Sequence, residues 1–168
     1  ITDDPDSIEL FKLYKEAGID VLIIGAEAGS DYELEIYAKV ADLADNFRCF
    51  RVLDELDLFF VHNGFIMFGP YSTMDTLRQN IRFLWENNRS FLWTNLDNTL
   101  ILTPGAVLFD FLSQEEGRVL PTENFWDLPA YTFDDPRVRS LAKQFMGLHT
   151  TYPHLMEGEA VQLEGYNI

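Results

Sequence analysis

Residues 64–73, with the sequence GFIMFGPYST, decide the fold class that this chain is expected to adopt. The apolar run from His62 to Phe68 has no polar alternation, which is typical of a strand covered on both faces in a parallel sheet. The run stops at Gly69-Pro70, and Ser72 or Thr73 then offers a hydroxyl cap for a helix. Apolar residues recur at helical spacing along that helix: Met74, Leu77, Ile81 and Leu84. The stretch therefore predicts one βα unit.

Two further units of the same kind flank this stretch. Residues 21–25 (VLIIG) form a short β-branched run that favours a strand, and residues 91–94 together with 98–103 predict a third strand. Helices are expected over 6–17, just after Asp31, over 41–56, from 74 to about 87, through 107–112, and from 135 to about 148. Alternating strands and helices predict an α/β fold with a parallel sheet and right-handed crossovers.

Composition limits the classes of protein to which the chain can belong. Its 168 residues, 47% of them hydrophobic, are enough for one domain with a core. No apolar run is long enough for a membrane span and no leader opens the sequence, so a cytoplasmic protein without membrane contacts is expected. The net charge of −16 disfavours direct binding to nucleic acid. The first residue is Ile1 rather than methionine, and we therefore expect that an N-terminal part is missing.

The chain is not expected to bind a metal through its own residues. Its one cysteine, Cys49, lies between Phe47 and Phe50 and is interpreted as a packed thiol, so neither a disulfide nor a thiolate cluster can form within the chain. His149 and His154 are five residues apart without acidic or thiol companions, which gives no metal site. His62 is interpreted as a core histidine.

Polar and small residues mark the ends of the predicted strands. Glu27 lies among small residues in 25–30 (GAEAGS), at the edge of the sheet where parallel α/β folds bind ligands, although an acid there can also cap the next helix. Gly64 and Gly69 flank the second strand, where glycine permits the close approach of a ligand or relieves a bend. The polar residues of 95–99 either face a polar lumen or mark a bulge or strand end.

The periodic pattern stops after Gly117. Residues 118–135 contain prolines, acids and aromatic side chains without a repeat, which predicts a long loop packed by its rings. The aromatic residues concerned are Phe125, Trp126, Tyr131 and Phe133. A helix and a tail follow, so residues 118–168 are expected to form an extension to the α/β part of the chain.

Four collinear stretches resemble the radical S-adenosylmethionine family, in the branch that often carries a cobalamin-binding domain, within the Elongator-like and methylthiotransferase group. Residues 13–18 and 21–31 are similar to the family string "LKEAG…VFIGVESGSD", and residues 45–48 to "EDNLRA". Residues 64–73 are similar to "GFIMFDPYTT", and 102–108 to "LYPGTPL". The chain departs from these strings at Ala28 (family serine), Gly69 (aspartate) and Ala106 (threonine).

The resemblance implies a fold for the chain and a ligand site on it. Residues 1–117 would be the second half of a (β/α) barrel of the TIM type, a partial barrel of three βα units, with residues 118–168 as an extension of helix and loop. Position by position, the residues implied to bind S-adenosylmethionine or to lie beside the substrate are Glu27, Ser30, Lys39, Gly64, Ile66, Phe68 and Thr103. Glu27 would contact the ribose, and Ser30 would support its loop. Lys39 would lie near the methionyl carboxylate, unless it is a surface charge, and residues 64–68 would line the adenine.

The resemblance also implies an activity. Members of the family use a [4Fe–4S] cluster to cleave S-adenosylmethionine to a 5′-deoxyadenosyl radical, which modifies a small-molecule or peptide substrate. The branch adds cobalamin on an upstream domain, and a ferredoxin or flavodoxin supplies the electron. The cluster motif CxxxCxxC is absent from this sequence, so the chain alone is expected to be an inactive fragment whose catalytic residues the motifs do not identify. The alternative is a non-enzymatic α/β module that binds a ligand or a partner.

Overall fold

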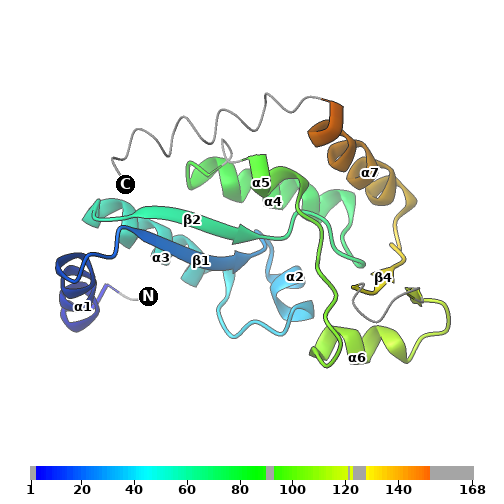
Figure 1. Ribbon diagram of the computed structural model, residues 1–168, viewed down its shortest axis with the longest axis horizontal. Coiled ribbons are helices and arrows are strands. Elements are labelled where there is room, and N and C mark those ends of the chain that lie inside the picture. Colours follow the sequence, from blue (N-terminus) through cyan, green and yellow to red (C-terminus); the bar gives the residue numbers. More distant parts are fainter. Residues whose placement is uncertain (1–2, 90–92, 121, 123–127, 152–168) are drawn as a thin grey trace.

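The structure is a computed structural model that describes residues 3–89, 93–120, 122 and 128–151. Figure 1 shows two parallel strands at the centre, with α1 at their amino ends and α2, α6 and β4 on the side toward which they point. The elements in chain order are α1 (Pro5–Glu16), β1 (Val21–Glu27), α2 (Asp31–Ile36), α3 (Leu43–Leu56), β2 (Phe60–Phe65), α4 (Met74–Glu86), α5 (Trp93–Asp97), α6 (Val107–Ser113), β3 (Val119–Leu120), β4 (Ala130–Tyr131) and α7 (Pro136–Thr151).

The first two predicted βα units are present. Strands β1 and β2 pair in parallel with Val21 opposite Phe60 and Gly25 opposite Gly64, and the register shifts between Gly25 and Glu27. The chain reaches β2 from β1 through α2 and α3, as parallel pairing requires. The structure therefore confirms the prediction of an α/β fold with parallel strands.

The predicted third strand is wrong in most of its length. Trp93–Asp97 form helix α5, residues 91 and 92 lie outside the described residues, and the described residues 98–103 form no strand. A single parallel bridge joins Phe68 to Thr99, supported by the Leu100 N–H, which donates to the Phe68 carbonyl at 2.9 Å. The physical reason is that the polar side chains of this segment bond to neighbouring backbone: the Asn95 amide donates to the Arg89 carbonyl at 2.9 Å, and the Asn98 amide to the Phe65 carbonyl at 2.9 Å.

The core lies on one face of the two strands. Ala26 of β1 and Val61 and Phe65 of β2 are buried against apolar side chains of α3 and α4. The opposite face is open within the described residues, because Val21 is 42% exposed and Ile23 is 75% exposed. The expectation of a strand covered on both faces is therefore corrected: the described part of the chain covers one face.

Helix α4 begins where the sequence predicts, but the stripe of side chains that it buries differs from the predicted one. Thr73 is the N-cap, with its hydroxyl accepting the Thr76 N–H at 3.1 Å and its own N–H donating back to the Thr76 hydroxyl at 2.9 Å. Leu77 and Leu84 are buried as expected, but Ile81 is 53% exposed. Asn80 and Phe83 take its place in the core because Phe83 stacks on Phe65 of β2 and meets Phe47 and Phe50 of α3.

The C-terminal part of the described chain packs on the α/β part. Strands β3 and β4 form a short antiparallel pair within the predicted loop, and Tyr131 lies against Phe133 at 5.3 Å between ring centroids. Val138 and Ala142 of α7 join the main core. Phe125 and Trp126 lie outside the described residues, and the division of the chain at residues 117 and 118 stays a prediction. No helix in the described ranges has the length and apolar character needed to cross a membrane.

Candidate functional site

The two parallel strands end beside each other, and the chain leaves β1 in an uncommon conformation. Glu27, the last residue of β1, has φ 64°, in the left-handed region that residues other than glycine rarely adopt. Its carbonyl accepts the Ile66 N–H at 2.7 Å, which ties the end of β1 to the chain just after β2. Such a conformation costs on the order of 1–3 kcal/mol and is found most often at functional sites.

Glu27 and Lys39 form an ion pair across this strand end. The Lys39 Nζ lies 2.9 Å from the Glu27 Oε1, and the two side chains are 25% and 35% exposed, Glu27 being the less accessible. A pair that is this accessible to water contributes about 1 kcal/mol or less to stability, which is not enough to offset the backbone strain at Glu27. The alternative that Glu27 caps α2 is excluded by the geometry, since the N-cap of that helix is Ser30.

The ion pair lies over a surface without side chains. A Cβ built on Gly25 would come within 2.7 Å of the Glu27 Oε1, so the carboxylate already occupies that space. Gly64 is different: a Cβ there would make ordinary contacts, at 3.5 Å or more, with the Gly25 backbone. The protein itself would accept a side chain at residue 64, so its absence leaves the open face of the sheet flat beside the ion pair.

The structure places only some of the other predicted site residues beside the Glu27–Lys39 ion pair. Ile66 is adjacent to Glu27 through its backbone hydrogen bond and is half-buried. Phe68 is 2% exposed and lies against Phe145 of α7 at 5.8 Å between ring centroids, so its side chain belongs to the core. Thr103 is exposed in the segment before α6, where its carbonyl accepts the Ala106 N–H at 3.1 Å.

Beneath the strand ends is a buried carboxylate that the sequence did not single out. Glu33 is 1% exposed and accepts hydrogen bonds from four side chains. Ser72 Oγ and Thr76 Oγ1 donate to its Oε1 at 2.5 and 3.0 Å, while Ser30 Oγ and Asn80 Nδ2 donate to its Oε2 at 3.2 and 2.8 Å. The S-x-x-E spacing of Ser30 and Glu33 is a capping-box signal, but it gives no hint of the three contacts made by distant residues.

A neighbouring tyrosine side chain explains why residue 69 is glycine here, where the resembled family has aspartate. The Tyr37 hydroxyl occupies the place that a Cβ on Gly69 would take, so any larger residue would have to displace that ring. Burial raises the pKa of Tyr37 well above its ordinary value, and the nearby Glu33 carboxylate raises it further. Tyr37 is therefore a neutral hydroxyl at this position.

The cysteine and the histidines do not form a site in the part of the chain that the structure describes. Cys49 is 7% exposed within the main core, which confirms the packed thiol, and burial raises its pKa. His62 is half-buried on the open face of β2 rather than in the core, which corrects its interpretation. His154 and the side chain of His149 lie outside the described residues. Nowhere in the described ranges do three or more His, Cys, Asp or Glu side chains converge as metal ligands would.

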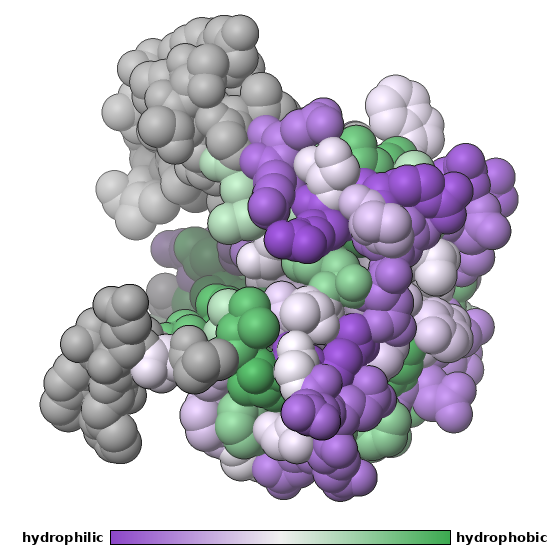
Figure 2. All heavy atoms as spheres, turned by 90° about the vertical axis from the view of Figure 1, so that its right-hand side faces the viewer, coloured by the Kyte–Doolittle hydropathy of each residue, from purple (hydrophilic) through white to green (hydrophobic). Residues whose placement is uncertain are grey.

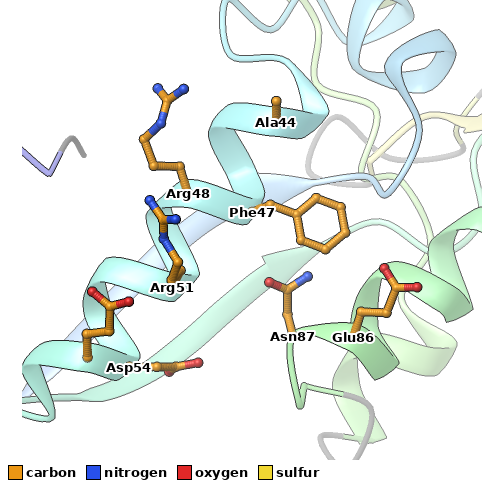
Figure 3. Close-up of a pocket in the computed structure, with 8 residues that line it drawn as sticks. Ala44, Phe47, Arg48, Arg51, Asp54, Glu86 and Asn87 are labelled. Carbon is orange, nitrogen blue, oxygen red and sulfur yellow. The ribbon is translucent and has the colours of Figure 1, made fainter.

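Two cavities in the described part of the chain are lined by neither Glu27 nor Lys39. The first, of about 890 Å³, is on the outer side of α3 and α4 (Figure 3), where Arg48 and Arg51 are paired with Asp45 at 3.1 Å and Asp3 at 3.3 Å. The second, of about 550 Å³, lies between α2 and α6 and is lined mainly by apolar side chains, among them Tyr71 and Phe111. Figure 2 views the molecule from the side to which the strands point and shows apolar side chains gathered beside strongly polar ones.

The fold is that of an α/β domain whose parallel strands end at an ion pair and a strained backbone residue. No family model matches the chain. It is 31% identical over 86 residues to the anaerobic magnesium-protoporphyrin IX monomethyl ester cyclase of Cereibacter sphaeroides, a match that covers 51% of this chain and 14% of the cyclase. The apo structure of OxsB, a cobalamin-dependent S-adenosylmethionine radical enzyme, superposes with a TM-score of 0.64 and 18% identity, over 85% of this chain and 26% of OxsB.

These two relationships confirm the resemblance seen in the sequence. The chain is related to the cyclase in sequence and shares its fold with OxsB, a cobalamin-dependent radical S-adenosylmethionine enzyme. It spans a small part of each relative, 14% of the cyclase and 26% of OxsB.

Proposed function

We propose that this chain is the S-adenosylmethionine-binding part of a radical enzyme, with the ligand held at the ends of β1 and β2. The observation that carries the proposal is the Glu27–Lys39 ion pair over the flat surface made by Gly25 and Gly64. Backbone strain at Glu27 supports it, because strain that structural contacts do not offset points to function.

The residues at this edge match the groups of the ligand. The Glu27 carboxylate can accept hydrogen bonds from the two ribose hydroxyls, and the Lys39 ammonium can pair with the methionyl carboxylate. The bare surface at Gly64 and the apolar side chain of Ile66 suit the flat adenine. On binding, Lys39 would exchange part of its contact with Glu27 for the carboxylate of the ligand, which keeps both charges paired.

Together with an iron–sulfur cluster, S-adenosylmethionine supplies one-electron radical chemistry that no amino-acid side chain provides. This sequence has one cysteine, Cys49, and it is buried in the core. The three thiolates of the cluster would therefore come from a segment outside this sequence, as would any cobalamin-binding domain. The part played by the chain itself is to bind and orient the ligand, in a partial barrel whose open face carries Ile23 and His62.

Substrate, reductant and compartment are inferred from the family. We expect a small-molecule or peptide substrate, a ferredoxin-like or flavodoxin-like electron donor and a cytoplasmic setting. The net charge of −16 argues against an RNA substrate bound by this part of the protein.

Calorimetric titration of the 168-residue chain with S-adenosylmethionine tests the proposal. Wild type is expected to bind one ligand, and Glu27→Gln to weaken binding by roughly tenfold or more, because charge-assisted hydrogen bonds to the ribose are lost. Glu86→Gln is the matched control, since it removes one carboxylate in the outer cavity lined by α3 and α4. Absence of saturable binding by the wild type, or equal affinities for the two variants, would contradict the proposed site.

A further inference from the structure

We propose that Glu33 is a positioning residue that sets the two strand-end loops in register for ligand binding. The inference rests on the proposed function and assigns a role to a residue that does not itself reach the ligand surface. Glu33 and the four side chains that donate to it are nearly inaccessible to water, with exposures of 1% for Glu33, Ser30 and Ser72, 5% for Thr76 and 0% for Asn80.

The donors come from both loops and from the helix that follows the second. Ser30 belongs to the loop after β1, Ser72 to the loop after β2, and Thr76 and Asn80 to the first turns of α4. The carboxylate is thus the common acceptor for elements that are about 40 residues apart in sequence. Each loop also carries part of the proposed ligand surface, Glu27 on one side and Ile66 on the other.

Each of these side chains also holds a backbone amide in place. Ser72 Oγ accepts the Gly69 N–H at 2.8 Å, Thr76 Oγ1 accepts the Thr73 N–H at 2.9 Å, and Asn80 Oδ1 accepts the Gly29 N–H at 2.7 Å. Ser30 Oγ accepts the N–H of Glu33 itself at 3.3 Å. Each group thus accepts a backbone N–H while its own N–H or O–H donates to Glu33, and the Thr76 hydroxyl also lies 3.1 Å from the Thr73 carbonyl.

This arrangement requires a carboxylate and not an amide at residue 33. A carboxylate accepts on both oxygens, whereas glutamine would present an NH₂ group on one side, facing two of the buried donors. A buried donor without a partner is costly, so the loops would shift to relieve it. A shift of this kind would misplace Glu27 relative to Gly64 without removing any ligand contact.

The test compares the wild-type chain with three variants, by calorimetric titration with S-adenosylmethionine and by urea unfolding. Glu33→Gln is expected to weaken binding by about tenfold or more. Val138→Ala, which truncates a buried side chain of α7 that takes no part in the Glu33 hydrogen bonds, is the control for a general loss of stability. In the double variant Glu33→Gln/Asn80→Asp the donor and the acceptor are exchanged, because the carboxylate introduced at residue 80 accepts both from Gly29 and from the new amide. This variant should return to within about threefold of wild-type affinity.

The outcomes separate this inference from the proposed function. A wild-type chain that does not bind S-adenosylmethionine overturns the proposed function, and this inference with it. If wild type binds but Glu33→Gln and Val138→Ala have equal affinities, the site stands and the positioning role is wrong. Failure of the exchange variant to recover affinity, while its amide exchange at Gly29 and Gly69 returns to wild-type rates, also overturns the positioning role. If Glu33→Gln does not fold, the affinity of the exchange variant is compared with that of Val138→Ala instead. Recovery of near wild-type affinity then supports the positioning role, and lack of recovery overturns it.

Discussion

At the residue scale, Gly29 and Gly64 show that glycine serves two different purposes at this edge of the sheet. A Cβ on Gly29 would lie 2.5 Å from the Phe83 Cβ, 2.9 Å from the Asn80 Cα and 3.0 Å from the Gln79 carbonyl, because the loop after β1 packs directly on α4. A Cβ on Gly64 would meet nothing closer than 3.5 Å. The first glycine is required by packing, and the second leaves space on the open face.

Substitution of these two glycines should therefore have different consequences for stability. Gly29→Ala is expected to lower the free energy of unfolding by about 1–3 kcal/mol, since two packed backbones must move apart. Gly64→Ala should change it by less than about 1 kcal/mol. Urea denaturation followed by circular dichroism measures both, and equal losses of stability would contradict this assignment.

Gly64→Ala should nevertheless impair ligand binding. A methyl group on the open face would lie where the adenine is proposed to rest, so the affinity for S-adenosylmethionine should fall although the fold is intact. Binding by calorimetry, with the unfolding free energy measured on the same sample, distinguishes the two effects. An unchanged affinity would show that the ligand does not approach Gly64.

Single residues also show how far a sequence can predict a site. The motif strings brought Glu27 and Lys39 to attention, and the structure pairs them. Glu33 lies just beyond the same loop and was not found, because its partners Ser72, Thr76 and Asn80 are about 40 residues away and meet it only through the packing of α4. Phe68 was placed on the ligand side by the motif, but β2 ends at Phe65 and the Phe68 side chain turns into the core.

At the scale of elements, α4 connects the site to the core. Its N-terminal turn supplies donors to Glu33 and is held by the capping box between Thr73 and Thr76. Its apolar side, with Leu77, Phe83 and Leu84, faces the core under the strands. The hydroxyl cap was predictable from sequence, whereas the exposure of Ile81 was not, because helical spacing gives a stripe but not its exact centre.

Removal of the cap should have a measurable cost. Thr73→Ala is expected to reduce the free energy of unfolding by about 1 kcal/mol, because the Thr76 N–H loses its acceptor at the start of α4. Thr103→Ala, in the exposed segment before α6, should change it by less than about 0.5 kcal/mol and is the control. Equal unfolding midpoints in urea for these two variants would contradict the cap.

The start of α7 is predicted to depend on pH. Hydrogen bonds from the Arg137 side chain and N–H lower the pKa of Asp135 from 3.8 to about 2. Because the pKa is lowered in the folded state, this interaction stabilises the helix start above about pH 4 and is lost as the pH falls toward 2. Carboxyl resonances followed by NMR should show the low pKa, and Arg137→Gln should return it toward 3.8. An unaltered pKa in that variant would exclude the arginine as its cause.

At the scale of the whole molecule, the chain is a two-stranded parallel sheet covered by helices on one face, with the other face open in the described residues. Repeated strand and helix patterns were enough to predict the α/β class and the first two units. The third strand failed because its polar residues bond to neighbouring backbone and form α5 together with a single bridge to Phe68. Under the proposed function, the open face with Gly25, Gly64 and His62 would be the lumen of a barrel.

The central claim, that S-adenosylmethionine binds at the ends of β1 and β2, is tested most directly by NMR on chain labelled with ¹⁵N-glycine. The chain has 10 glycines, of which Gly25 and Gly64 pair at the proposed site and Gly18 lies before the amino end of β1. Titration should shift the Gly25 and Gly64 resonances to saturation at one ligand per chain and leave Gly18 unchanged. Saturating ligand that leaves Gly25 and Gly64 unshifted would contradict the claim.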